Sequence, residues 1–103
     1  MKVLITGAGG MLGRDVAIVA RNARHDVVAL DRDQLDVTDP GRVERVIGRE
    51  RPGAVINCAA WTDVDGAEEN EREASVVNAQ GAGFVADAAD KVDAKVICPS
   101  TDY

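Results

Sequence analysis

Four short apolar runs alternate along the chain with segments of helical period. These runs are Lys2–Thr6, Asp26–Asp31, Ala54–Cys58 and Ala94–Cys98. A short continuous apolar run bounded by glycine or polar residues is typical of a strand in a parallel sheet, which is buried on both faces. The order strand, helix, strand, repeated to a fourth strand, indicates an α/β protein.

Three helices are predicted between these strands, each from the spacing of its apolar residues. The first runs from Met11 to about Arg24, and Thr38 or Asp39 caps the second, which has Pro40 at its first position. The third runs from about Glu71 to Val92. The residues expected to face the core are Leu12, Val16 and Val19 in the first helix, Val43, Val46 and Ile47 in the second, and Val77, Phe84, Val85 and Ala88 in the third.

Strands joined by helical crossovers predict a Rossmann-like, doubly wound parallel sheet of the βαβαβαβ type. The expected strand order is 3-2-1-4, with the third strand at one edge and the fourth beside the first. Cys58 and Cys98 would then lie on non-adjacent strands. They match no metal-ligand spacing, so buried, reduced thiols and no metal site are expected.

Charge and composition exclude several classes of partner. The formal net charge is −6, and the Lys and Arg residues are scattered, which argues against a nucleic-acid surface. The apolar stretch of the N-terminal MKVLITG is too short for a signal-peptide core or a membrane span. A cytoplasmic protein without a membrane partner is therefore expected, and His25 is expected in an exposed turn rather than in catalysis.

A glycine cluster follows the first strand directly. Gly7, Gly10 and Gly13 form a G-x-x-G-x-x-G pattern between that strand and the first predicted helix. Gly7 would turn the chain, Gly10 would let the backbone approach a pyrophosphate, and Gly13 would let the helix lie close to the sheet. The free N–H groups at the start of this helix would then bind the phosphates of a dinucleotide.

The end of the second strand carries signals for both nicotinamide dinucleotides. Asp31 lies where a carboxylate accepts hydrogen bonds from the adenosine ribose of NAD(H). Arg32 follows at once and is able to clamp the additional 2′-phosphate of NADP(H). NADH and NADPH both stay open as the cofactor. Asp36 and Val37 lie where a loop would cover the adenine, although Asp36 is also suited to capping a turn.

Several segments together resemble the dTDP-4-dehydrorhamnose reductases, a family of the extended short-chain dehydrogenase/reductase superfamily. They are Thr6–Gly13 (TGAGGMLG), Asn57–Thr62 (NCAAWT), Val64–Glu68 (VDGAE), Asn78 and Ser100–Tyr103 (STDY). The resemblance covers the whole chain in order and in spacing. It implies reduction of the C4 ketone of dTDP-4-dehydro-6-deoxy-L-mannose by NADPH or NADH, which yields dTDP-L-rhamnose, a nucleotide sugar for cell-wall polysaccharide.

The resemblance also implies a role for individual residues. The implied cofactor-binding residues are Gly7, Gly10, Met11, Leu12, Gly13, Asp31, Arg32, Asp36, Val37, Ala59, Ala60 and Thr62. Val64 and Asp65 would border the dTDP-sugar substrate, and Tyr103 matches a substrate-side position. Thr101 matches the catalytic hydroxyl, which donates to the C4 carbonyl oxygen as hydride arrives.

The family's Y-x-x-x-K motif and substrate domain are expected beyond Tyr103. We therefore expect residues 1–103 to be the incomplete N-terminal part of one NAD(P)-binding Rossmann domain, inactive alone, from a longer protein that is able to form a homodimer. Two other functions stay open: a nucleotide-sugar epimerase or dehydratase of the same superfamily, and a regulatory module that binds the cofactor without chemistry.

Overall fold

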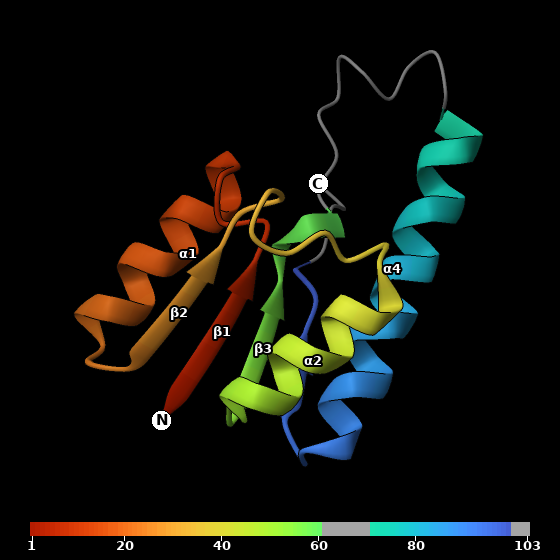
Figure 1. Cartoon of the computed structure of the whole chain (residues 1–103). Helices are drawn as coiled ribbons and strands as arrows, with labels where there is room; N and C mark the ends of the chain where they lie inside the picture. Colours follow the sequence, from red (N-terminus) through yellow and green to blue (C-terminus); the bar gives the residue numbers. More distant parts are fainter. Residues whose placement is uncertain (61–70, 100–103) are drawn as a thin grey trace.

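The computed structural model describes residues 1–60 and 71–99, and of residues 60 and 71–78 the backbone alone. Within these described residues, four strands and three α-helices alternate, with one short 3-10 helix (Figure 1). Their bounds are β1 Lys2–Thr6, α1 Met11–Asn22, β2 Asp26–Leu30, α2 Pro40–Glu50, β3 Ala54–Asn57, η1 Cys58–Ala60, α4 Glu71–Lys91 and β4 Lys95–Ile97. The predicted βαβαβαβ order is confirmed.

All four strands are parallel, and their order in the sheet is β2-β1-β3-β4. The Rossmann-like fold class is therefore confirmed, but the predicted strand order 3-2-1-4 is wrong. The third strand pairs with β1 rather than with β2. Cys58 and Cys98 consequently follow adjacent strands, not distant ones.

The position of α2 explains why β3 lies beside β1. Right-handed crossovers that run in opposite directions along a sheet place their helices on opposite faces. The chain moves from β1 to β2 through α1, and it then returns past β1 to β3 through α2 (Figure 1). The apolar stripe of α2 packs beside α4, on the face opposite to α1. A third strand beyond β2 would have placed α2 on the same face as α1.

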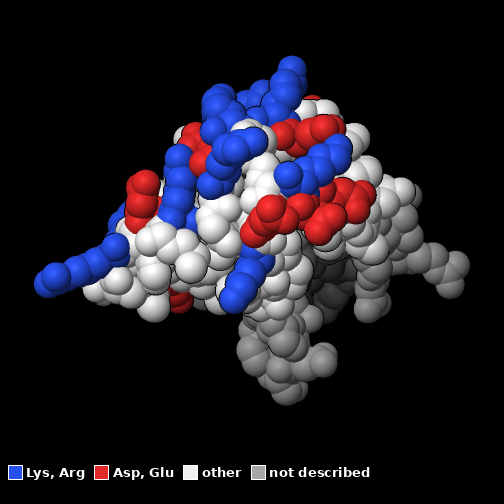
Figure 2. All heavy atoms as spheres, turned by 90° about the horizontal axis from the view of Figure 1, so that it is seen from below, with Lys and Arg blue, Asp and Glu red and all other residues white. Residues whose placement is uncertain are grey.

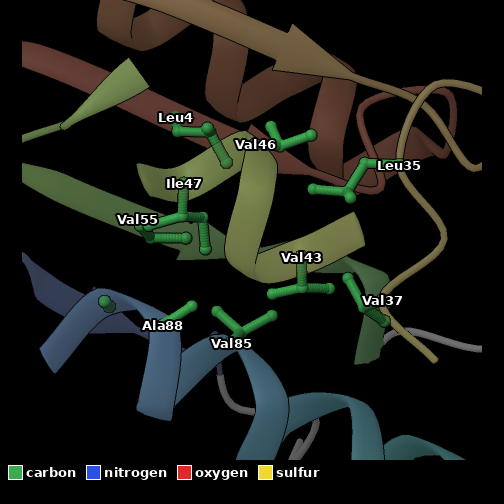
Figure 3. Packing of buried hydrophobic residues seen from close by; sticks show 10 residues of the cluster. Leu4, Leu35, Val37, Val43, Val46, Ile47, Val55, Val85 and Ala88 are labelled. Atoms are coloured by element: carbon green, nitrogen blue, oxygen red, sulfur yellow. The ribbon is translucent and has the colours of Figure 1, made fainter. Parts of the chain in front are cut away.

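Strand register divides the core into two layers. Leu4 pairs with Val28 and Val55 in the neighbouring strands, and these side chains face α2 and α4. The close view in Figure 3 shows this layer, in which Leu4 of β1 and Val55 of β3 lie beside α2 and Val85 of α4 points toward it. Val3, Ile5, Ala17, Ala20 and Cys58 form the layer on the α1 face. Both faces of the sheet are covered, as a parallel sheet requires.

The buried face of α1 differs in part from the prediction. Leu12 and Val16 are half-buried against the layer on the α1 face, as predicted, whereas Val19 is 67% exposed. The buried residues of the helix are the small ones, Gly13, Ala17 and Ala20, and at Gly13 the glycine turn leaves no room for a side chain. The core positions of α2 are confirmed, as are Val85 and Ala88 in α4, while Phe84 is half-buried. Val77 lies among the residues whose side chains are not described.

Both cysteines are free thiols, as predicted, but only one of them is buried. Cys58 lies in the α1 layer, and burial raises the pKa of its thiol above the usual range. Cys98 is exposed, because β4 is an edge strand with a neighbour on one side only among the described residues. His25 is exposed after the turn that ends α1, as expected.

The edge of the sheet where the strands begin carries mixed charge. Figure 2 views the molecule from this side and shows basic and acidic side chains next to one another. Lys2 and Arg49 both pair with Glu50, with N–O distances of 2.8 and 3.7 Å. In the described part of the chain, no helix is long and apolar enough to cross a membrane.

Candidate functional site

The glycine turn lies at the carboxyl end of β1, where the strand order reverses. Gly7 has a φ of +64°, a left-handed conformation that side chains rarely adopt. A Cβ at Gly7 would lie 2.6 Å from the backbone nitrogen of Ala59. At Gly13 a Cβ would lie 2.2 Å from the carbonyl oxygen of Gly7. The turn therefore packs backbone against backbone, both on η1 and on the first turn of α1.

Gly10 differs from these two glycines in what surrounds it. It is exposed, and a Cβ on it would meet only ordinary contact, 3.6 Å from the carbonyl oxygen of Gly7. It is the N-cap residue of α1 and provides no side-chain hydrogen bond to the helix. The first N–H groups of an α-helix have no acceptor within the helix. The start of α1 thus combines an uncapped helix end with the absence of a Cβ, as a phosphate-binding site requires.

A buried hydrogen bond joins the ends of β1 and β3 beneath this turn. Thr6 Oγ1 donates to Asn57 Oδ1 at 2.6 Å, and both residues are buried. The backbone N–H of Ala59 points to the same hydroxyl at 3.4 Å. This contact holds the segment after β3 against the glycine turn. The sequence alone assigns no role to Thr6 and Asn57, because their pairing depends on the strand order.

Asp31 lies beside the glycine turn, one residue after β2. A Cβ on Gly9 would be 3.2 Å from the Cβ of Asp31. The carboxylate oxygen Oδ1 of Asp31 accepts a hydrogen bond of 2.9 Å from the backbone N–H of Gln34. The Gln34 side-chain oxygen accepts one of 3.0 Å from the N–H of Asp31. Nothing in the pattern of apolar residues singled out Gln34.

An open hollow of about 410 Å³ lies between α1 and the turn after β2. Gly9, Asp31 and Gln34 line it on one side, and Arg14 and Arg21 of α1 line it on the other. Asp31, the residue predicted to bind the adenosine ribose, thus borders a space that is continuous with the start of the glycine turn. The basic residues on its rim make the hollow suited to an anionic or a polar ligand.

The other residues predicted after β2 face different surroundings. Asp36 Oδ1 accepts hydrogen bonds from the Thr38 hydroxyl at 2.6 Å and from the Thr38 N–H at 3.0 Å. These bonds lower the pKa of Asp36 below its usual range, and Arg32, which is exposed, contributes to the shift. The side chain of Val37 is buried in the layer between the sheet and α4. A contact of Val37 with a ligand would therefore use its backbone.

Some of the remaining predicted site residues lie in the described part of the chain, and others lie outside it. Met11 is 85% exposed at the start of α1, and Leu12 is half-buried against the α1 layer. Ala59 lies in η1 next to Gly7, and Ala60 completes η1. The predictions for Thr62, Val64, Asp65, Thr101 and Tyr103 fall outside the described residues. Within the described part, no group of three or more His, Cys, Asp or Glu side chains is arranged to hold a metal ion.

Comparison with known proteins points to one family. The family model described as "RmlD substrate binding domain" matches residues 1–103. A dTDP-4-dehydrorhamnose reductase from Mycobacterium tuberculosis is 48% identical over 99% of this chain and 33% of its own length. The chain therefore spans about a third of the length of such relatives.

Solved structures agree with this result. A dTDP-4-dehydrorhamnose reductase from Bacillus anthracis in complex with NADP is 40% identical, covers 92% of this chain and 34% of its own, and has a TM-score of 0.82. A UDP-glucose 4-epimerase from Thermotoga maritima with UDP-glucose has a TM-score of 0.82 at 22% identity, over 98% of this chain and 38% of its own, which shows the fold alone. The glycine turn and the parallel sheet agree with these matches. The chain belongs to the RmlD substrate binding domain family, whose curated relatives include dTDP-4-dehydrorhamnose reductases.

Proposed function

We propose that the protein reduces the C4 ketone of a dTDP-4-dehydro-6-deoxy sugar with NADPH or NADH, and that this chain supplies the cofactor-binding half. The product would be dTDP-L-rhamnose. The observation that carries the proposal is the uncapped start of α1 behind a glycine turn that packs on η1. Two relatives support it: the mycobacterial reductase by name, and the Bacillus anthracis reductase by its bound NADP.

The described residues fit a dinucleotide. The N–H groups at the start of α1, from Met11 to Gly13, are suited to the pyrophosphate, and the helix dipole adds to the attraction. Gly10 has no Cβ that would keep the phosphates away from the backbone. Asp31, beside Gly9, is suited to the ribose hydroxyls. Bound there, the dinucleotide would supply the hydride for the ketone.

The roles of the remaining residues are proposed from the family resemblance. Ala59, Ala60 and Thr62 would follow the cofactor along the carboxyl end of β3, where small side chains let it lie close. Val64, Asp65 and Tyr103 would contact the sugar nucleotide. The Thr101 hydroxyl would donate to the C4 carbonyl oxygen and stabilise the negative charge that develops there. Cytoplasmic location and a homodimer belong to the same proposal, since both come from the sequence and the resemblance.

Steady-state turnover by the natural full-length protein tests this function. The assay follows NADPH and NADH at 340 nm with dTDP-4-dehydro-6-deoxy-L-mannose, and it identifies the product by chromatography. We expect one cofactor oxidised for each dTDP-L-rhamnose formed. An epimerase would convert the sugar nucleotide without net loss of cofactor, and a regulatory module would bind the cofactor without turnover. Either of these results would reject the proposed reduction.

A further inference from the structure

Gly81 lies on the buried face of α4, one helical turn before Val85. Its φ is not positive, so its backbone conformation does not require a glycine. A glycine inside a helix lowers the stability of that helix relative to alanine, because glycine loses more conformational freedom on folding. What Gly81 provides instead is space for a close contact.

This space is filled by Val37, from the loop between β2 and α2. A Cβ on Gly81 would lie 2.8 Å from Cγ2 of Val37, 3.5 Å from its Cβ and 3.4 Å from its carbonyl oxygen. Val37 is buried beside Val43 in the apolar layer that α2 and α4 enclose (Figure 3). A β-branched side chain in such a layer has few rotamers with which to move aside. The contact between Gly81 and Val37 therefore has no room for an added methyl group.

The loop around Val37 is fixed on both sides. Before it, the carbonyl oxygen of Gln34 accepts hydrogen bonds from Nε and Nη2 of Arg42, at 3.2 and 3.0 Å. After it, Asp39 is the N-cap residue of α2 and accepts a hydrogen bond from the N–H of Arg42. α4 itself is held against the core by Val85. A methyl group added at Gly81 would thus displace residues 36–38, which lie between these anchors.

Asp36 is the side chain that this part of the loop presents to the outside. It is exposed, whereas Leu35 and Val37 on either side of it are buried. Its Oδ1 accepts two hydrogen bonds from Thr38, so the carboxylate moves together with residues 37 and 38. The family resemblance places Asp36 and Val37 near the adenine. A carboxylate there accepts a hydrogen bond from the 6-amino group of adenine, but not from the carbonyl oxygen that hypoxanthine carries instead.

We propose that Gly81 is a positioning residue for the adenosine half of the cofactor site. Because it has no Cβ, Val37 lies directly against α4, and this contact sets where the Asp36 carboxylate meets the adenine. Gly81 touches no ligand and acts through Val37. This role rests on the proposed function, because it requires that the dinucleotide binds at the glycine turn.

Fluorescence titration of the natural full-length protein tests this role with two ligands. One is NADH or NADPH, whichever binds more tightly, and the other is its deamino form, in which hypoxanthine replaces adenine. We expect the wild type to bind the deamino form about tenfold more weakly, and Gly81→Ala to lower this ratio of dissociation constants at least about threefold. Gly83→Ala is the matched control in the same helix and should leave the ratio unchanged, because a Cβ there meets no atom within 4 Å.

Changes at Val37 test whether the effect passes through this contact. Val37→Ala makes room for the added methyl group, so Val37→Ala combined with Gly81→Ala should bring the ratio back to within about twofold of the wild type. Val37→Ile alone adds a methyl group to the same contact from the side of the loop and should lower the ratio in the way that Gly81→Ala does. It provides the test if Gly81→Ala does not fold.

A general loss of structure would weaken both dinucleotides equally, so the ratio reports on positioning. An unchanged ratio in Gly81→Ala and Val37→Ile would overturn the inference, as would a double variant with no higher ratio than Gly81→Ala. A wild type that binds both forms equally would overturn it as well, because the loop would then not contact the base. Binding of neither NADH nor NADPH would instead reject the proposed function itself.

Discussion

Replacing Gly13 by Ala tests the packing that forms the glycine turn. The added Cβ would lie 2.2 Å from the Gly7 carbonyl oxygen and 2.7 Å from the Cα of Ala8. Both atoms belong to the backbone, so the start of α1 has to move away. Overpacking of this kind costs about 3 kcal/mol, against which alanine gains about 1 kcal/mol in helix propensity. We expect a net loss of about 2 kcal/mol in the free energy of unfolding.

Urea unfolding and NADH titration measure the two consequences of this change. Gly48→Ala in α2 is the matched control, because a Cβ there meets no atom within 4 Å. It should stabilise the protein by about 0.5–1 kcal/mol and leave NADH binding unchanged. Gly13→Ala should bind NADH about tenfold more weakly, since the helix N–H groups are displaced from the phosphates. A Gly13→Ala protein as stable as the Gly48→Ala protein, with unchanged NADH binding, would show that the glycine turn does not depend on the missing Cβ at Gly13.

Three further predictions concern buried or titratable groups. Thr6→Val removes a buried hydrogen bond and should lower stability by about 1–3 kcal/mol in urea unfolding, while Thr6→Ser should retain most of it; equal losses would contradict the role of the hydroxyl. Hydrogen bonds from Thr38 lower the pKa of Asp36, so the ionised carboxylate stabilises the folded protein above its unfolded pKa of 3.8. This contribution to the free energy of unfolding is lost as pH falls through the lower pKa of the folded state. Thr38→Val should therefore lower stability at neutral pH by about 0.5 kcal/mol and have little effect below both pKa values, and a loss that is independent of pH would argue against this linkage. Iodoacetamide should label Cys98 before Cys58, whose thiol is buried and has a raised pKa, and mass spectrometry showing the reverse order would contradict the burial.

The sequence predicts elements well here because each is specified locally. The apolar run of Lys2–Thr6 and the cap and proline of Asp39-Pro40 mark a strand and a helix without reference to the rest of the chain. Strand order is not local. Each strand is mostly apolar on both faces, so its sequence does not say which strands lie beside it. The strand order depends on which face of the sheet α2 covers.

The candidate site likewise contains residues that the local sequence indicates and residues that only the folded chain brings together. The glycines and Asp31 were found from their spacing, because they mark a turn between a strand and a helix. The Thr6–Asn57 bond spans 51 positions and depends on β1 and β3 being adjacent. Gln34 was missed because its bond to Asp31 is a property of one turn, whose sequence has no distinctive pattern.

Hydrogen–deuterium exchange of the natural full-length protein with and without NADH tests whether the glycine turn and the start of α1 bind the dinucleotide. We predict that NADH slows exchange in residues 7–14 and 31–35 and leaves α2, at the opposite face of the sheet, unchanged. Binding of NADH with no protection of residues 7–14 would show that the dinucleotide binds away from the glycine turn.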